Sequence, residues 1–189
     1  LLDLIGSKNI KIDKDKNSNP TLNKIFQQAA EAMAEGDFVA AMALFDEARQ
    51  DDDDNSDAHY GWADAAFMRL TIDMEDDVPA ALIMRGYKRA MELDEENLEY
   101  VAGFAGFCLD CGRLPMAVKE YSRLQKMAEL QELDVNDMLY EAAARLVEAV
   151  ERLDRNAPVA QPLLAQALGW AVTGLGFTPE EAAALLSGD

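Results

Sequence analysis

The 189-residue sequence predicts an all-α fold, a solenoid of helix-turn-helix repeats followed by capping helices at its carboxyl end. Two observations support this prediction. Apolar residues recur at steps of three and four along much of the chain, which is the spacing of amphipathic helices. One arrangement of a glycine, an alanine and an aromatic residue returns at a fixed spacing, and such repetition is the signature of stacked helical repeats.

The returning arrangement starts at a turn glycine. Gly36 leads after five residues to an alanine and after nine to an aromatic residue, and Gly112 does the same. A glycine at this place suits the left-handed backbone that ends a helix. The alanine lets two helices cross closely, and the aromatic ring fills the space beside it. Between the two copies, Tyr87 and Ala90 repeat the aromatic-to-alanine ending.

This pattern resembles the tetratricopeptide repeat, over residues 22–131 of the chain. The resemblance implies a right-handed α-solenoid built from helical hairpins. Its three repeats are expected at 22–55, 56–97 and 98–131. Ala29 and Ala105 stand at the small-residue place of the first helix in repeats one and three, and Trp62-Ala63 forms the large-small pair of repeat two.

The second repeat departs from the family by an insertion near residues 71–77. The extra residues lengthen either the first helix of the repeat or the turn after it. The second helix of this repeat is expected to begin near Val78 and to end at Asp94. The insertion also changes the local shape of any groove that the repeats form.

Both ends of the chain extend beyond the repeats. Residues 1–21 are polar and lack periodicity, so we expect a flexible leader. Residues 132–189 are expected to form a helical cap, because the last repeat of a solenoid has an apolar side to cover. Within it, 136–154 has one apolar face, and Thr178-Pro179-Glu180-Glu181 has the signature of a helix start. The alternative is a degenerate fourth repeat with its second helix at 162–170.

The charge of the chain restricts its partners. Seventeen basic residues stand against 36 acidic ones, for a formal net charge of −19. A nucleic-acid-binding protein needs a basic face to replace the counterions of phosphate, and this composition excludes that class. Apolar or basic protein segments fit the charge better. No apolar stretch is long enough to span a membrane, which predicts a soluble protein. Two cysteines are too few for a disulfide scaffold and suggest the cytoplasm or another reducing compartment.

The candidates for chemistry are few. Cys108 and Cys111 form a Cys-x-x-Cys string, but it closes a predicted helix and has no second pair, so packing explains it better than redox or zinc chemistry. His59 is the single histidine and has no evident nucleophile beside it. The acidic run 51–54 lacks the ligand pattern of a calcium loop. We therefore expect no enzyme, no metal site and no cofactor.

The tetratricopeptide resemblance implies that a partner binds on the concave face, which the first helices line. On this sequence that face would present Phe26, Ala30, Met33, Tyr60, Asp64, Phe67, Met68, Ala102, Gly106 and Leu109. This apolar and acidic set lacks the basic residues that grip acidic chaperone tails. In size and composition the array is more similar to the chaperones of type III secretion translocators.

The resulting expectation is a non-enzymatic protein-interaction module, such as an adaptor, scaffold or assembly factor. The alternative is a constitutive structural subunit of a larger complex, with both faces permanently covered. The changes Tyr60→Ala and Phe67→Ala are expected to weaken capture of a partner without unfolding the protein.

Overall fold

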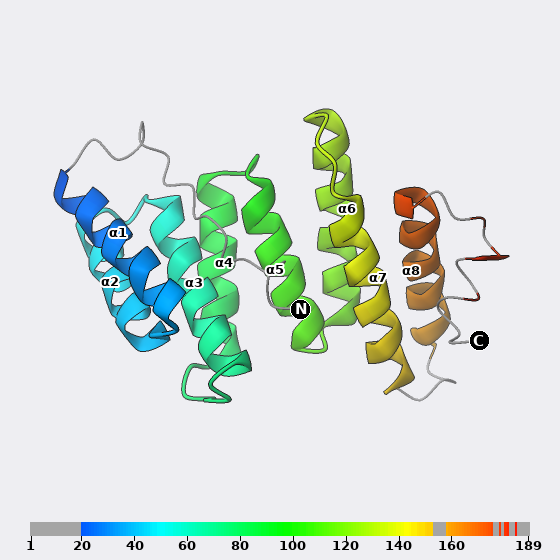
Figure 1. Cartoon of the computed structure of the whole chain (residues 1–189), viewed down its shortest axis with the longest axis horizontal. Helices are drawn as coiled ribbons and strands as arrows, with labels where there is room; N and C mark the ends of the chain where they lie inside the picture. Colours follow the sequence, from blue (N-terminus) through cyan, green and yellow to red (C-terminus); the bar gives the residue numbers. More distant parts are fainter. Residues whose placement is uncertain (1–19, 153–157, 176–177, 179, 182–183, 185–189) are drawn as a thin grey trace. The chain divides into compact units, whose positions relative to one another are not determined.

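The computed structural model describes residues 20–152 and 158–175, together with 178, 180–181 and 184. These residues contain no strand, so the predicted all-α fold is confirmed (Figure 1). The helices are α1 (Pro20–Glu35), α2 (Phe38–Asp51), α3 (Ser56–Thr71), α4 (Ala80–Leu93), α5 (Leu98–Asp110), α6 (Leu114–Leu130), α7 (Asn136–Glu151) and α8 (Ala160–Leu175). The expected leader lies outside the described residues except for Pro20 and Thr21, which begin α1.

The chain divides into two compact units, residues 1–103 and 104–189, and the division falls within α5. In the first unit, α1, α2 and α3 each pack against the helix that follows. In the second unit, α7 packs extensively on α8, and both helices touch α6. Packing between helices that are neighbours in the sequence is consistent with a helical repeat solenoid.

The tight turns lie at the two glycines where the sequence predicts them. Gly36 separates α1 from α2 with a φ of +78°, and Gly112 separates α5 from α6 with a φ of +68°. Glycine adopts this left-handed backbone without a steric penalty. After the first turn, the carboxylate of Asp37 accepts a hydrogen bond of 2.9 Å from the backbone N–H of Ala40, which caps α2.

The core of the first unit depends on small residues at the helix crossings. Ala29, Ala41 and Ala48 are fully buried, and the rings of Phe26 and Phe45 meet edge to face with centroids 6.0 Å apart. Gly61 brings α3 against the same Phe45 ring, because a Cβ atom at this position would lie 2.4 Å from it. Steric space therefore decides these positions as much as hydrophobicity does.

The residues expected as an insertion of the second repeat lie in the turn between α3 and α4. Helix α3 has 16 residues, as α1 does, and residues 72–79 connect it to α4. Arg69 holds this turn through two hydrogen bonds from Nε and one from Nη2 to the carboxylate of Asp77, at 2.6–3.2 Å. The φ of Met74 is +59° and its side chain is 80% exposed. An ion pair thus fixes a turn whose backbone is strained.

Changing Arg69 to Ala is expected to release this turn while leaving the helices folded. Asp77 loses the partner that keeps the pKa of its carboxyl group below the ordinary value, and the strained backbone at Met74 loses its restraint. Limited proteolysis should then cut within 72–79 faster than in the wild type, with an unchanged far-ultraviolet circular dichroism spectrum. Arg85→Ala, an exposed change on α4, is the matched control. Equal cleavage of all three proteins would show that Arg69 does not hold the turn.

In the second unit, α7 ends at Glu151, whereas the sequence predicted a helix to residue 154. Residues 153–157 lie outside the described part of the chain. Helix α8 begins at Ala160 and ends at Leu175, so it is longer than the segment expected for the second helix of a fourth repeat. The rings of Tyr121 and Trp170 meet at a centroid distance of 5.5 Å and join α6 to α8. The domain boundaries beyond residue 131 stay a prediction.

The helix start expected at Thr178 is present. The Thr178 hydroxyl accepts a hydrogen bond of 3.2 Å from the backbone N–H of Glu181, and the Glu181 carboxylate accepts one of 2.9 Å from the backbone N–H of Thr178. These reciprocal bonds form a capping box. The rest of the predicted terminal helix falls largely on residues that the structure does not describe. Among the described helices, none combines the length and apolarity that a membrane span requires.

Candidate functional site

The residues predicted to line a concave face lie mostly inside the helix packing. Ala30 and Ala102 are half-buried, and the others, Phe26, Met33, Tyr60, Asp64, Phe67, Met68, Gly106 and Leu109, are buried. Phe26, Met33 and Met68 belong to one core cluster of the first unit. These side chains therefore offer little surface to a partner, and their role in partner binding stays a prediction.

Two of these residues, Tyr60 and Asp64, lie close together in the structure. Tyr60 forms a cluster with two other buried tyrosines, Tyr87 and Tyr100, which we call the tyrosine cluster. The Tyr60 ring stacks on Tyr100 at a centroid distance of 4.8 Å and meets Tyr87 edge to face at 5.7 Å. The Tyr87 hydroxyl donates a hydrogen bond of 3.1 Å to Oδ1 of Asp64. The cluster thus joins α3 to α4 and to the first half of α5.

Asp64 is a buried carboxyl group with an incomplete set of partners. It is 2% exposed, and its Oδ2 atom has no hydrogen-bond partner among the described residues. Burial raises the pKa of Asp64 to about 7, the hydrogen bond from Tyr87 lowers it, and the negative charge of Glu99 raises it further. Near neutral pH, a large fraction of Asp64 is therefore protonated, which an exposed aspartate would not be.

A second carboxylate satisfies the other end of the cluster. The Tyr100 hydroxyl donates to Oδ1 of Asp57 and lies 3.2 Å from the Ser56 hydroxyl oxygen. Burial, followed by the negative charge of Asp57, raises the pKa of Tyr100, so this phenol stays a donor. The polar atoms of the cluster therefore serve the packing of α3 against α4 and α5.

This arrangement corrects one expectation. The change Tyr60→Ala removes a ring that is 2% exposed and in contact with two other tyrosines. Removing a buried aromatic ring destabilises a fold by about 3–5 kcal/mol, so Tyr60→Ala is not a change that spares the fold. The same holds for Phe67→Ala, since Phe67 is 3% exposed. A functional test needs exposed side chains.

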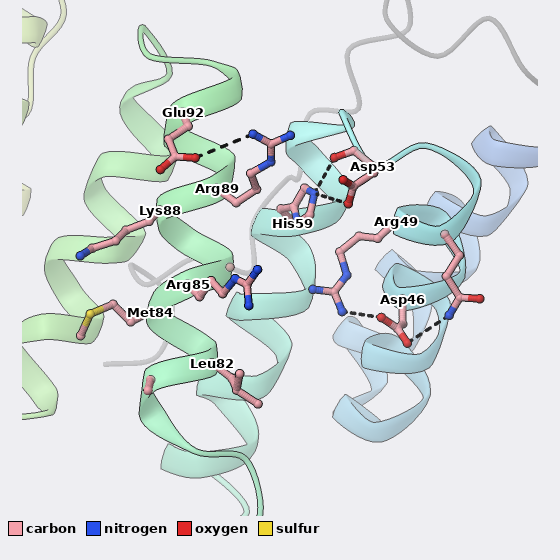
Figure 2. A pocket seen from close by; sticks show the side chains of 13 residues that line it. Asp46, Arg49, Asp53, His59, Leu82, Met84, Arg85, Lys88, Arg89 and Glu92 are labelled. Carbon is pink, nitrogen blue, oxygen red and sulfur yellow. Dashed lines mark hydrogen bonds and ion pairs between the residues drawn. The ribbon is translucent and has the colours of Figure 1, made fainter.

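The first unit carries a cleft between α2 and α4, over α3, with a volume of about 860 Å³. Figure 2 shows the side chains that surround it. Its lining consists of Asp46, Arg49, Gln50, Asp53, His59, Ala81, Leu82, Met84, Arg85, Gly86, Lys88, Arg89 and Glu92. The lining holds four cations and three carboxylates, in a chain whose formal net charge is −19.

Arg49 forms a fixed positive wall on the α2 side of the cleft. Its guanidinium group lies over the Trp62 ring, 4.4 Å from the centroid, and Nη2 donates to the Asp46 carboxylate. Its Nε atom is buried with no hydrogen-bond partner among the described residues. The cation–π contact and the ion pair together hold this side chain in place.

The histidine and the acidic run 51–54 lie at one end of this cleft. Nε2 of His59 lies 2.8 Å from the backbone oxygen of Asp53 and 3.7 Å from its carboxylate (Figure 2). The His59 side chain is buried. Asp54 pairs with Arg89 of α4 at 2.9 Å. The acidic run is therefore held to α3 by the contact of Asp53 with His59 and to α4 by the ion pair of Asp54 with Arg89.

Arg85 differs from the other cations of the cleft. It is exposed, and it makes no hydrogen bond or ion pair with any described residue. In Figure 2 its side chain extends from α4 toward Arg49, and none of the carboxylates drawn lies between the two. Two guanidinium groups that face each other across open space create a local positive potential. The electrostatic potential between Arg49 and Arg85 therefore favours a negatively charged group.

The sequence contains a signal for this cleft in the basic residues of α4. Helix α4 holds Arg85, Lys88 and Arg89 at helical spacing, with Glu92 as its one carboxylate. In an acidic chain such a stripe predicts a basic helix face. The tetratricopeptide resemblance implies a binding surface on the first helices of the repeats, whereas this basic face belongs to α4, the second helix of the expected second repeat.

The cysteines are placed as the packing interpretation expected. Cys108 is fully buried in α5, and Cys111 follows that helix half-buried. Burial, and then the charge of Asp110, raises the pKa of the Cys111 thiol. A raised pKa lowers the thiolate fraction and so the reactivity of a cysteine. A comparison of the sequence with protein-family models and with curated proteins finds no match.

Proposed function

We propose that this chain is a non-enzymatic protein-interaction module of the tetratricopeptide type, which holds a segment of a partner protein in the cleft between α2 and α4. The observation that supports it best is the exposed lining of that cleft. Leu82 is 47% exposed, and Arg85 has no hydrogen-bond or ion-pair partner within the described residues. One apolar and one charged side chain, about one helical turn apart, are therefore available to a partner.

The composition of the cleft favours a protein segment over a small molecule. Small-molecule sites are enclosed mainly by apolar and aromatic side chains with a few polar groups. Here seven of the thirteen lining residues are Asp, Glu, Arg or Lys. Exposed polar and charged side chains around an apolar contact are typical of the rim of a protein–protein interface.

Crosslinking from within the cleft tests the proposal. The full chain carries the photoreactive residue p-benzoylphenylalanine at position 82 and is irradiated in a lysate of its source organism. A discrete partner is expected to crosslink and to be identified by mass spectrometry. The same residue at position 39 is the control, because Val39 is also an exposed apolar residue of this unit but does not line the cleft.

The two sites separate the possible outcomes. A partner captured at position 82 and absent at position 39 supports binding in the cleft. The same proteins at both positions would mean unspecific contact and would contradict the proposal. If the chain is instead a constitutive subunit, position 82 and position 39 should crosslink to different subunits of one complex, which purifies with the wild-type chain without irradiation.

A further inference from the structure

We propose that the occupant of the cleft is an acidic protein segment, in which a carboxylate binds Arg85 and a neighbouring apolar side chain covers Leu82. This inference rests on the proposed function and narrows it to one class of partner. It also reverses the expectation from the net charge, which favoured apolar or basic partners. The cations that line the cleft favour an acidic partner over a basic one.

The first step is the state of the cations. Arg49 is engaged with Asp46 and Trp62, so it contributes charge without being free to move. Arg85 presents its five N–H donors to solvent, and no described carboxylate accepts from them. The planar guanidinium group matches the two oxygens of a carboxylate, which it can bind through two parallel hydrogen bonds.

The second step is the exchange of weak internal pairs. Arg89 pairs with Asp54 at 2.9 Å and lies 3.8 Å from Glu92, and both carboxylates are well exposed. Exposed ion pairs of this kind contribute about 0–1 kcal/mol to stability. A carboxylate of an incoming segment can therefore replace Asp54 on Arg89 at little cost. Arg85 and Arg89 lie one helical turn apart, so successive acidic groups of one segment can reach both.

The third step is the apolar contact. Leu82 precedes Arg85 by three residues on the same helix and is 47% exposed. Ala81, its neighbour in the chain, also lines the cleft, and neither of these two side chains has a polar atom. A partner leucine on this patch removes apolar surface from water beside the carboxylate pair, which strengthens the pair by lowering the local dielectric. A segment with both acidic and apolar residues thus fits better than a purely acidic one.

The large negative charge of the chain does not cancel this attraction. At physiological ionic strength the Debye length is about 8 Å, so carboxylates on distant helices are largely screened from a ligand in the cleft. The groups that decide binding are those of the lining, where cations exceed carboxylates by one. Asp46 and Glu92 already pair with Arg49 and Arg89, and Asp53 lies 3.7 Å from Nε2 of His59.

Fluorescence anisotropy with three short peptides tests the inference. All carry a neutral fluorophore and alternate Leu with Glu, Gln or Lys. The Glu–Leu peptide is expected to bind the full chain at least about tenfold more tightly than the Gln–Leu peptide, which is the effect of one charge-assisted hydrogen-bonded pair. Tighter binding of the Lys–Leu peptide would overturn the inference, because it would assign the cleft to a basic partner.

Variants locate the binding. Arg85→Glu is expected to weaken binding of the Glu–Leu peptide by about tenfold or more. Lys24→Glu on α1 changes the net charge by the same amount at another exposed position of the unit and should leave the affinity within about twofold. Equal effects of the two variants would attribute binding to the overall charge and would contradict the role of Arg85.

Two further outcomes are distinct from failure of the proposed function. If crosslinking at position 82 captures a partner but the Glu–Leu and Gln–Leu peptides bind equally, the module stands and the acidic segment is wrong. Sedimentation of the chain alone tests a second copy as the occupant. A dimer that Arg85→Glu dissociates and Lys24→Glu does not would assign the cleft to another molecule of this chain and would also overturn the inference.

Discussion

Asp64→Asn is expected to remove a pH-dependent loss of stability that the wild type shows between about pH 4 and pH 7. In the folded protein, burial raises the pKa of Asp64 from 3.8 to about 7. Between these values the folded chain holds a proton that the unfolded chain has released. The contribution of protonated Asp64 to the free energy of unfolding is therefore fully present below pH 3.8. It decreases as the pH rises and is lost as the pH passes through about 7.

The size of the effect follows from the shift. One pKa unit corresponds to 1.36 kcal/mol, so Asp64 should lower the free energy of unfolding by roughly 2–3 kcal/mol between pH 5 and pH 8. The Asn side chain is neutral at both pH values, and its carbonyl oxygen can still accept from the Tyr87 hydroxyl. Urea unfolding curves of both proteins at the two pH values measure the difference.

Asp76→Asn is the matched control, because it makes the same change at an exposed position of the turn between α3 and α4. Its stability should follow that of the wild type from pH 5 to pH 8. If Asp64→Asn and Asp76→Asn have the same pH profile as the wild type, then Asp64 is ionised in the folded protein throughout this range. The proposed protonation of the buried carboxyl group would then be wrong.

Gly61→Ala is expected to destabilise the first unit by about 1–3 kcal/mol, although alanine is the better helix former. The added Cβ would lie 2.4 Å from the Phe45 ring, which is fully buried and already in contact with Phe26. The ring has no room to move away, so overpacking outweighs the gain of up to about 1 kcal/mol in helix propensity. Thermal or urea unfolding measures the net loss.

A double-mutant cycle identifies the cause. In a Phe45→Leu background the smaller side chain leaves room for the new methyl group, so Gly61→Ala should cost less by about 0.5–3 kcal/mol. Gly169→Ala on α8 is the control, because nothing lies within 4 Å of its Cβ position, and it should gain up to about 1 kcal/mol. Additive effects of the two changes would show that Phe45 does not exclude a side chain at position 61.

Much of the fold could be predicted because local features determine it. The apolar periodicity of each segment predicts a helix whatever its neighbours are. The turns at Gly36 and Gly112 follow from the backbone that glycine favours, and the capping box at Thr178 depends on residues three positions apart. The insertion at 71–77 was visible as a break in spacing, and only its placement in the turn needed the structure.

The contacts around the candidate site could not be predicted, for a physical reason. A repeat pattern gives the helices but not the rotation of each helix about its axis, and a small rotation decides whether a residue faces a groove or the core. The sequence pattern expects Tyr60 and Asp64 on a concave face but does not give their contacts with Tyr87, which is 23 residues beyond Asp64 in the chain. A carboxyl group is rarely buried, so composition could not predict this contact.

The sequence by itself determined that the chain is helical, where its turns lie and how acidic it is. Only the tertiary structure decided that Asp64 loses its solvent and that Arg85 faces Arg49 across a cleft formed by α2 and α4. The first group of properties depends on neighbours within a few positions along the chain. The second depends on which helix faces pack together, because burial and local electric potential are set by residues that are distant in sequence.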